Sequence, residues 1–176
     1  MMDQAPSSNS PKGSTVSADD SAPSDDRNEG SEPPEQVKKS AVDLIAAYAD
    51  HDRDELDRVI PPATDHADAV VSQLKVLAAF LSRRVRETGV LWKPADSREA
   101  VARTVAEMLP PELEFAVSTA WEAHSLGEEE IAERFTLGDP MIYAHMLGAF
   151  CAAIGLAVYK HAELVPTLRQ VSGIGE

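Results

Sequence analysis

The stretch PMIYAHMLGAFCAAIGLAVY, Pro140 to Tyr159, decides the fold, because it contains no Asp, Glu, Lys or Arg over 20 residues. A helix of that length can cross a membrane. A helix that is apolar all round can equally form the centre of a soluble bundle. His145, two glycines and five alanines hold the hydrophobicity of this run near the threshold for a span. We therefore predict a central core helix over residues 140–163.

The sequence around this run has helical rather than strand periodicity. Apolar residues recur every three or four positions, most clearly at Val70, Leu74, Leu77, Leu81 and Val85. The predicted helices cover residues 35–50, a short segment that stops at Pro61 and Pro62, and residues 64–89, 97–109, 111–124, 128–135, 140–163 and 163–171. Because amphipathic helices need an apolar surface to cover, we expect an all-α, compact multi-helix orthogonal bundle of about seven helices around the buried C-terminal helix.

Capping residues mark the expected ends of these helices. The predicted N-caps are Thr64 or Asp65, Asp96 or Ser97, the pair Ser125 and Glu128 as a capping box, and Asp139 before Pro140. Pro111 suits a first helical turn, and Gly89 can end a helix in a left-handed conformation.

Composition divides the chain into a tail and a domain. Residues 1–34 contain seven acids and two bases and almost no apolar residue, so we predict a disordered acidic Ser/Pro-rich tail there. The tail is a solubilising segment or, alternatively, an interaction or phosphorylation segment. Residues 35–171 form a single helical domain, and residues 172–176 form a flexible C-terminus. The start MMDQAPSSNSPKGS lacks the basic and apolar regions of a signal peptide, which predicts a cytoplasmic protein.

The segment EEEIAERFTLGDPMIYAHM, residues 128–146, resembles the helix-turn-helix motif of bacterial regulators. Ile131, Ala132 and Phe135 match its first helix, Leu137 matches its apolar turn residue, and Ile142 matches an inward position of its second helix. The resemblance covers about 20 of 176 residues. It implies a second helix that enters the major groove of DNA.

The chemistry of this segment departs from that motif. Thr136 stands where the motif usually has Gly, and Gly138 comes two residues late. The exposed face of the second helix would present Gly138, Asp139, Pro140, Tyr143, Ala144 and Leu147. That face offers no Arg, Lys, Asn or Gln, and Glu128, Glu129 and Glu130 precede it. Because phosphate contacts supply most of the affinity for DNA, we expect a bend between packed helices instead.

Histidines and carboxylates suggest a second alternative. His51 and Asp52 are neighbours in ADHDRDE, and His66 and Asp68 lie in TDHAD. Such residues can ligate a metal in a hydrolase, but near a helix start they also serve as caps. Neither His-Glu-x-x-His nor a phosphate-binding Gly-rich loop occurs in the sequence. These four residues are therefore kept only as metal candidates, and we expect no cofactor.

Other residues attract attention for their surroundings. Arg83, Arg84, Arg86, Trp92 and Lys93 form the main basic concentration, which either complements a helix dipole or docks an acidic partner or a phosphate. Trp92 is an interface anchor or a cover for the core.

Two residues lie inside the apolar run. His145 is a buried neutral histidine or, alternatively, a pH or ligand sensor. Cys151 is the single cysteine, which we interpret as a small buried apolar residue.

Three functions remain open at this point. The favoured one is a non-enzymatic cytoplasmic interaction or regulatory protein that acts through protein–protein contacts and can form a homo-oligomer. The alternatives are a helix-turn-helix-like transcription regulator that binds DNA and a small helical metal-dependent hydrolase. The net charge of −14 repels nucleic acid at long range, and a membrane is also disfavoured as a partner.

Overall fold

The computed structural model describes residues 32–175, which form eight α-helices and no strand. The helices are α1 (Glu35–Asp50), α2 (Arg53–Thr64), α3 (Ala67–Thr88), α4 (Pro94–Met108), α5 (Pro111–Ser125), α6 (Glu129–Phe135), α7 (Pro140–Val158) and α8 (His161–Ser172). The predicted all-α class is confirmed within these residues. The predicted acidic tail lies, up to residue 31, outside them.

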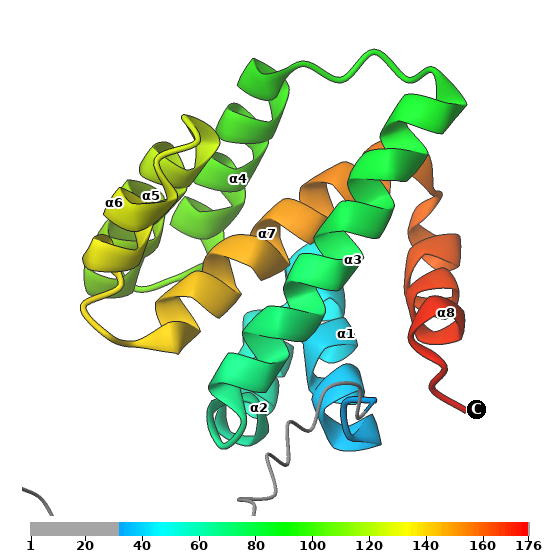
Figure 1. Cartoon of the computed structure of the whole chain (residues 1–176), viewed down its shortest axis with the longest axis horizontal. Coiled ribbons are helices and arrows are strands. Elements are labelled where there is room, and N and C mark those ends of the chain that lie inside the picture. The colour runs from blue at the N-terminus through cyan, green and yellow to red at the C-terminus, as the bar shows by residue number, and fades with distance from the viewer. Residues whose placement is uncertain (1–31, 176) are drawn as a thin grey trace, which may run out of the picture. The chain divides into compact units, whose positions relative to one another are not determined.

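Helix α7 is the centre of the bundle. Figure 1 shows it crossing between α3, α1 and α4, and its most extensive packing is against α3. Thirteen of its 19 residues are buried. Among the described residues it is the one helix long and apolar enough to cross a membrane, but 72% of that apolar window is buried inside the fold. The prediction of a core helix is therefore confirmed.

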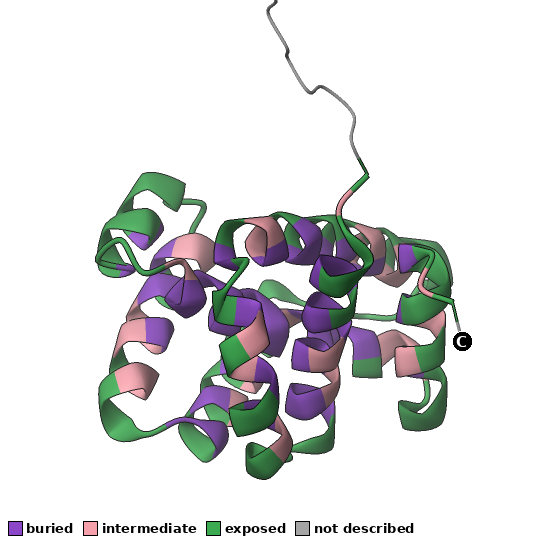
Figure 2. Cartoon of the chain, turned by 90° about the horizontal axis from the view of Figure 1, so that it is seen from below, coloured by how far each residue is buried: buried purple, intermediate pink, exposed green. Residues whose placement is uncertain are grey.

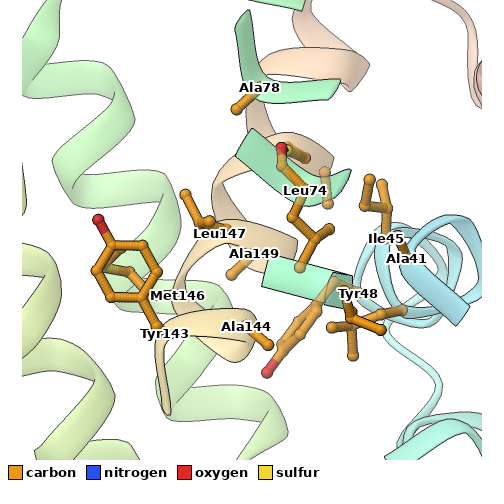
Figure 3. Packing of buried hydrophobic residues seen from close by; sticks show 14 of the residues in the cluster. Ala41, Ile45, Tyr48, Leu74, Ala78, Tyr143, Ala144, Met146, Leu147 and Ala149 are labelled. Carbon is orange, nitrogen blue, oxygen red and sulfur yellow. The ribbon is translucent and has the colours of Figure 1, made fainter. Parts of the chain in front are cut away.

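The small residues of α7 let other helices approach closely. A Cβ atom added to Gly148 would lie 3.2 Å from Leu44 Cγ and from Tyr48 Cδ2. Figure 3 shows Tyr48 of α1 pointing toward α7 near Ala144, while Leu74 of α3 packs from a neighbouring side. Figure 2 shows the buried residues gathered on the faces that the helices turn toward one another. Glycine and alanine on α7 thus set the spacing of the core.

The predicted stop at Pro61 and Pro62 is wrong, because α2 continues to Thr64. A proline can occupy a helix when its fixed φ fits, at the cost of one backbone hydrogen bond. Both prolines fall in the last turn of α2, so the two missing backbone N–H donors weaken only the C-terminal end of the helix. Thr64 donates to the Ile60 carbonyl at 2.9 Å from inside α2, which removes it as a cap for α3. The N-cap of α3 is His66, whose side chain makes no capping bond.

Two other predicted caps act differently in the structure. The Asp96 carboxylate accepts from the Lys93 backbone N–H at 2.8 Å, so α4 begins earlier, at Pro94. Ser125 belongs to α5 and donates to the Glu122 carbonyl at 2.8 Å. The predicted capping box is therefore wrong, and α6 starts after Glu128 without a side-chain cap.

The end of the core helix was also predicted too late. Tyr159 and Lys160 are extended, with ψ of 149° and 151°, so α7 ends at Val158. The Glu163 carboxylate accepts from the Lys160 backbone N–H at 3.4 Å and organises the start of α8 at His161. By contrast, the predicted start is confirmed: the Asp139 carboxylate accepts from the Met141 backbone N–H at 2.9 Å.

The helix-turn-helix-like segment is a bend into the core. Thr136 is right-handed, and the left-handed positions of the turn are Leu137, with φ 53°, and Gly138, with φ 80°. Within the second helix, Tyr143 and Leu147 are buried rather than presented outward. Of the face that would read bases in a DNA regulator, Tyr143, Ala144 and Leu147 are thus part of the protein core, and Asp139, an acid, is exposed.

Candidate interaction surface

Exposed apolar side chains are concentrated on α5, on α6 and in the turns that flank α6. Ten large apolar side chains are exposed among the described residues, and five of them fall in this segment. The five are Phe115, Leu126, Ile131, Phe135 and Leu137, and the exposed surface of this segment is called the α5–α6 face below. Figure 1 shows α5 and α6 side by side at one edge of the helical domain. Single exposed apolar residues are ordinary, but a concentration with a polar rim marks an interaction site.

This face lies in the most acidic part of the helical domain. Between residues 111 and 139, eight carboxylates stand against Arg134 as the one Lys or Arg, which is a net charge of −7. The carboxylates belong to Glu112, Glu114, Glu122, Glu128, Glu129, Glu130, Glu133 and Asp139. Half of the net charge of −14 is thus carried by 29 residues. The α5–α6 face is both apolar and strongly negative.

The turn between α6 and α7 forces Leu137 outward. Thr136 donates from Oγ1 to the Glu133 carbonyl at 2.6 Å, and its own carbonyl accepts from the Asp139 N–H at 2.8 Å. Leu137 is left-handed between these contacts, and 87% of it is exposed. A left-handed conformation costs a residue with a Cβ about 1–2 kcal/mol. Neither the strain nor the exposure stabilises the fold, and such strain is concentrated at functional sites.

A half-buried network fixes α6 beneath this face. The rings of Trp121 and Tyr143 flank His124, with centroids 5.8 and 5.9 Å from the imidazole. His124 Nδ1 lies 3.3 Å from the Tyr143 hydroxyl and 3.3 Å from a Glu129 carboxylate oxygen. Burial lowers the pKa of His124, against the opposing effect of Glu129, and raises the pKa of Tyr143 to about 12. A hydrogen-bonded junction with a neutral imidazole at its centre therefore holds α5, α6 and α7 together.

An open recess borders the Leu137 turn. It has a volume of about 470 Å³ and lies between α3 and the start of α7. Its lining residues are Asp68, Val71, Ser72, Lys75, Glu133, Thr136, Gly138, Pro140 and Tyr143. The Lys75 ammonium sits 4.9 Å from the centre of the Tyr143 ring, a cation–π distance. The recess thus combines two carboxylates, one ammonium group and one aromatic ring beside the α6–α7 turn.

The metal candidates lie at two helix junctions. His51 is the left-handed C-cap of α1, with its Nδ1 3.1 Å from the Glu107 carboxylate of α4, and Asp52 caps α2. His66 precedes α3, and Asp68 lies in its first turn. Within residues 32–175, no group of three or more His, Cys, Asp or Glu side chains could hold a metal ion. The four candidate residues therefore do not come together in one metal site.

The predicted basic residues occupy the end of α3 and the linker to α4. Arg83 and Arg86 are exposed on the last turns of α3. Arg84 donates from Nε to the Tyr159 hydroxyl at 3.1 Å and pairs with the Glu87 carboxylate at 2.8 Å. Arg83 lies 3.9 Å from the same carboxylate group. One acid thus offsets part of this positive charge.

Trp92 and Lys93 fix the linker to the start of α4. Trp92 is half-buried against the core and donates from Nε1 to the Ser97 hydroxyl. Lys93 is exposed, and its backbone N–H is held by Asp96. Trp92 covers the edge of the core, while its neighbour Leu91 is 93% exposed. The most exposed apolar side chain in this linker is Leu91, which sequence reasoning had not singled out.

His145 and Cys151 are both inside the core. His145 Nδ1 lies 2.6 Å from the Tyr48 hydroxyl, and both residues are buried. Burial lowers the pKa of His145 to about 4, against a weaker opposing effect of Asp139. Burial also raises the pKa of Tyr48 and of the Cys151 thiol. The imidazole is thus neutral at pH 7, and the tyrosine remains protonated to donate to it.

No protein family, curated protein or solved structure matches this chain. Sequence reasoning missed the α5–α6 face, because Leu137 and Phe135 had been assigned to a helix-turn-helix pattern. The available signal was the short segment between Glu128 and Asp139, which places Ile131, Phe135 and Leu137 among five glutamates and aspartates close in sequence: Glu128, Glu129, Glu130, Glu133 and Asp139.

Proposed function

We propose that this protein is a non-enzymatic cytoplasmic interaction protein whose α5–α6 face binds a basic, apolar helical segment of a partner protein. The single observation that carries this proposal is the placement of five exposed large apolar side chains in a segment of net charge −7. The apolar side chains supply affinity through burial, and the carboxylates select a positive partner.

An amphipathic helix is the partner shape that suits this face. Ile131 and Phe135 are four residues apart on α6, so they form one ridge along the helix, which is a surface that an apolar helix face can cover. Leu137 extends that ridge beyond the end of α6. Lysines or arginines on the flanks of the bound helix would lie near Glu130 and Glu133.

The two other candidate functions lack such support. A DNA regulator needs exposed groove-reading side chains, but the second helix of the motif-like segment is buried in the core. A metal-dependent hydrolase needs several ligands in one place, and no such group occurs in residues 32–175.

A synthetic amphipathic helix with leucines on one face and lysines on the other tests the proposal. Fluorescence anisotropy of the labelled peptide should show saturable binding that weakens as salt is added, because exposed charges are screened. A peptide with glutamates in place of the lysines should not bind. A peptide that keeps the lysines but has serines in place of the leucines should bind far more weakly.

Matched variants of the protein locate the binding. Phe135→Ser and Leu137→Ser should each weaken peptide binding about tenfold, by loss of one buried apolar side chain. Val76→Ser is the control, since Val76 is an exposed apolar residue on α3, outside the face. Equal affinity for the lysine and glutamate peptides, or an equal effect of all three variants, would refute the proposal.

A further inference from the structure

The two most exposed large apolar side chains of the described residues lie in surroundings of opposite charge. Leu91 is 93% exposed in the linker between α3 and α4, and Leu137 is 87% exposed in the turn between α6 and α7. Residues 83–93 contain four basic residues and one acid, a net charge of +3, against −7 for residues 111–139. Each surface thus combines an exposed leucine with a net charge opposite to that of the other surface.

The linker is fixed well enough to present Leu91. Gly89 ends α3 in a left-handed conformation, with φ 69°, on one side of it. On the other side, Trp92 packs against the core and donates to Ser97. Leu91 therefore projects between two anchored residues, with the exposed side chains of Arg86 and Lys93 nearby in sequence. A short fixed loop loses little conformational entropy when it binds.

We propose that the Leu91 linker of one copy docks on the α5–α6 face of a second copy. This inference rests on the proposed function, because it names this chain as one occupant of the same face. A second copy is favoured by the charge complementarity between the two surfaces, both of which this chain carries. Figure 1 shows the α3–α4 linker and the α6–α7 turn at separate places on the helical domain.

Two different surfaces in contact make a heterologous, head-to-tail interface. Such an interface leaves one free linker and one free face at the ends, so association continues with concentration instead of stopping at a dimer. The basic helix of another protein and the linker of a second copy would compete for one face. Self-association therefore reduces the number of faces that are available to that partner.

Sedimentation velocity with two one-sided variants of the full chain tests this arrangement. The linker variant carries Leu91→Glu and Arg86→Glu, and the face variant carries Leu137→Lys. The wild-type protein should sediment faster as its concentration rises, and high salt should abolish the effect. Each variant alone should remain monomeric. An equimolar mixture should form a 1:1 dimer and nothing larger, since only one intact linker and one intact face can meet.

A control and the peptide assay separate the outcomes. Val76→Glu adds one negative charge outside both surfaces and should associate like the wild type, and circular dichroism checks that every variant is folded. A mixture of the two one-sided variants that stays monomeric would overturn the inference. If the lysine peptide still binds the face in that case, the proposed function stands and the occupant is another protein. A peptide that fails to bind would reject the proposed function separately.

Discussion

Replacement of His145 by glutamine should change how the stability of the protein depends on pH. His145 titrates with a pKa of about 4 in the folded chain because it is buried, whereas a free imidazole has a pKa of about 6.5. Between these values the unfolded chain binds a proton that the folded chain does not. Stability is therefore fully present above pH 6.5 and falls as pH decreases toward 4.

The size of this effect follows from the two pKa values. The difference corresponds to about 3 kcal/mol of unfolding free energy lost by pH 4, with a slope of about 1.4 kcal/mol per pH unit between the two values. Glutamine can accept the hydrogen bond from the Tyr48 hydroxyl but does not titrate. His145→Gln should therefore be less stable than the wild type at pH 7.5 by about 1 kcal/mol, through imperfect packing, and should lose less stability on acidification.

Urea unfolding followed by far-UV circular dichroism, repeated from pH 4.5 to 7.5, measures both slopes. The carboxylates and His124 titrate in both proteins, so the difference between the slopes isolates His145. His66→Gln is the control for the loss of a histidine, because His66 is exposed. Equal slopes for the wild type and His145→Gln would show that the imidazole is not held neutral by the core. A difference in slope would support the predicted pH sensitivity of His145.

Three further predictions concern single residues. Leu137→Asn relieves the left-handed strain at φ 53°, so it should raise the unfolding free energy by about 0.5–1 kcal/mol and weaken binding of the lysine peptide about tenfold. Lower stability with unchanged binding would contradict this prediction. Gly148→Ala places a methyl group 3.2 Å from Leu44 and Tyr48, so it should lower the unfolding free energy measured by chemical denaturation by about 1 kcal/mol. A higher unfolding free energy would show that the core relaxes around the methyl group. Complete burial raises the pKa of the Cys151 thiol, so this residue should react with a disulfide reagent only at the rate at which the protein unfolds. Fast labelling of the folded protein would contradict the burial of Cys151 in the core.

The central helix could be predicted from sequence because its signal does not depend on neighbours. A run without charges from Pro140 to Val158 has to be buried somewhere, and Asp139 with Pro140 marks its start through local bonds alone. The helix ends that were predicted wrongly depend on residues that can take either of two local roles. Thr64 can cap a helix or donate within one, and only the packing of α2 against its neighbours decides this.

The candidate face was harder to predict because exposure is a property of the assembled fold. Phe115, Ile131 and Phe135 occupy helical positions that could equally have faced the core. Leu137 follows a short helix, and its outward direction depends on a left-handed conformation that leucine rarely adopts. The acidic residues were visible in the sequence, but their association with unburied apolar side chains required the structure.

The most direct test of the central claim is an NMR titration of the uniformly labelled protein with the leucine–lysine peptide. Amide chemical shifts should change mainly between residues 113 and 139, with the largest changes around Ile131, Phe135 and Leu137. Amides of α8 and of the first turns of α1 should remain unchanged. Shift changes centred elsewhere, or none at peptide concentrations that saturate the anisotropy signal, would contradict the assignment of the α5–α6 face as the binding surface.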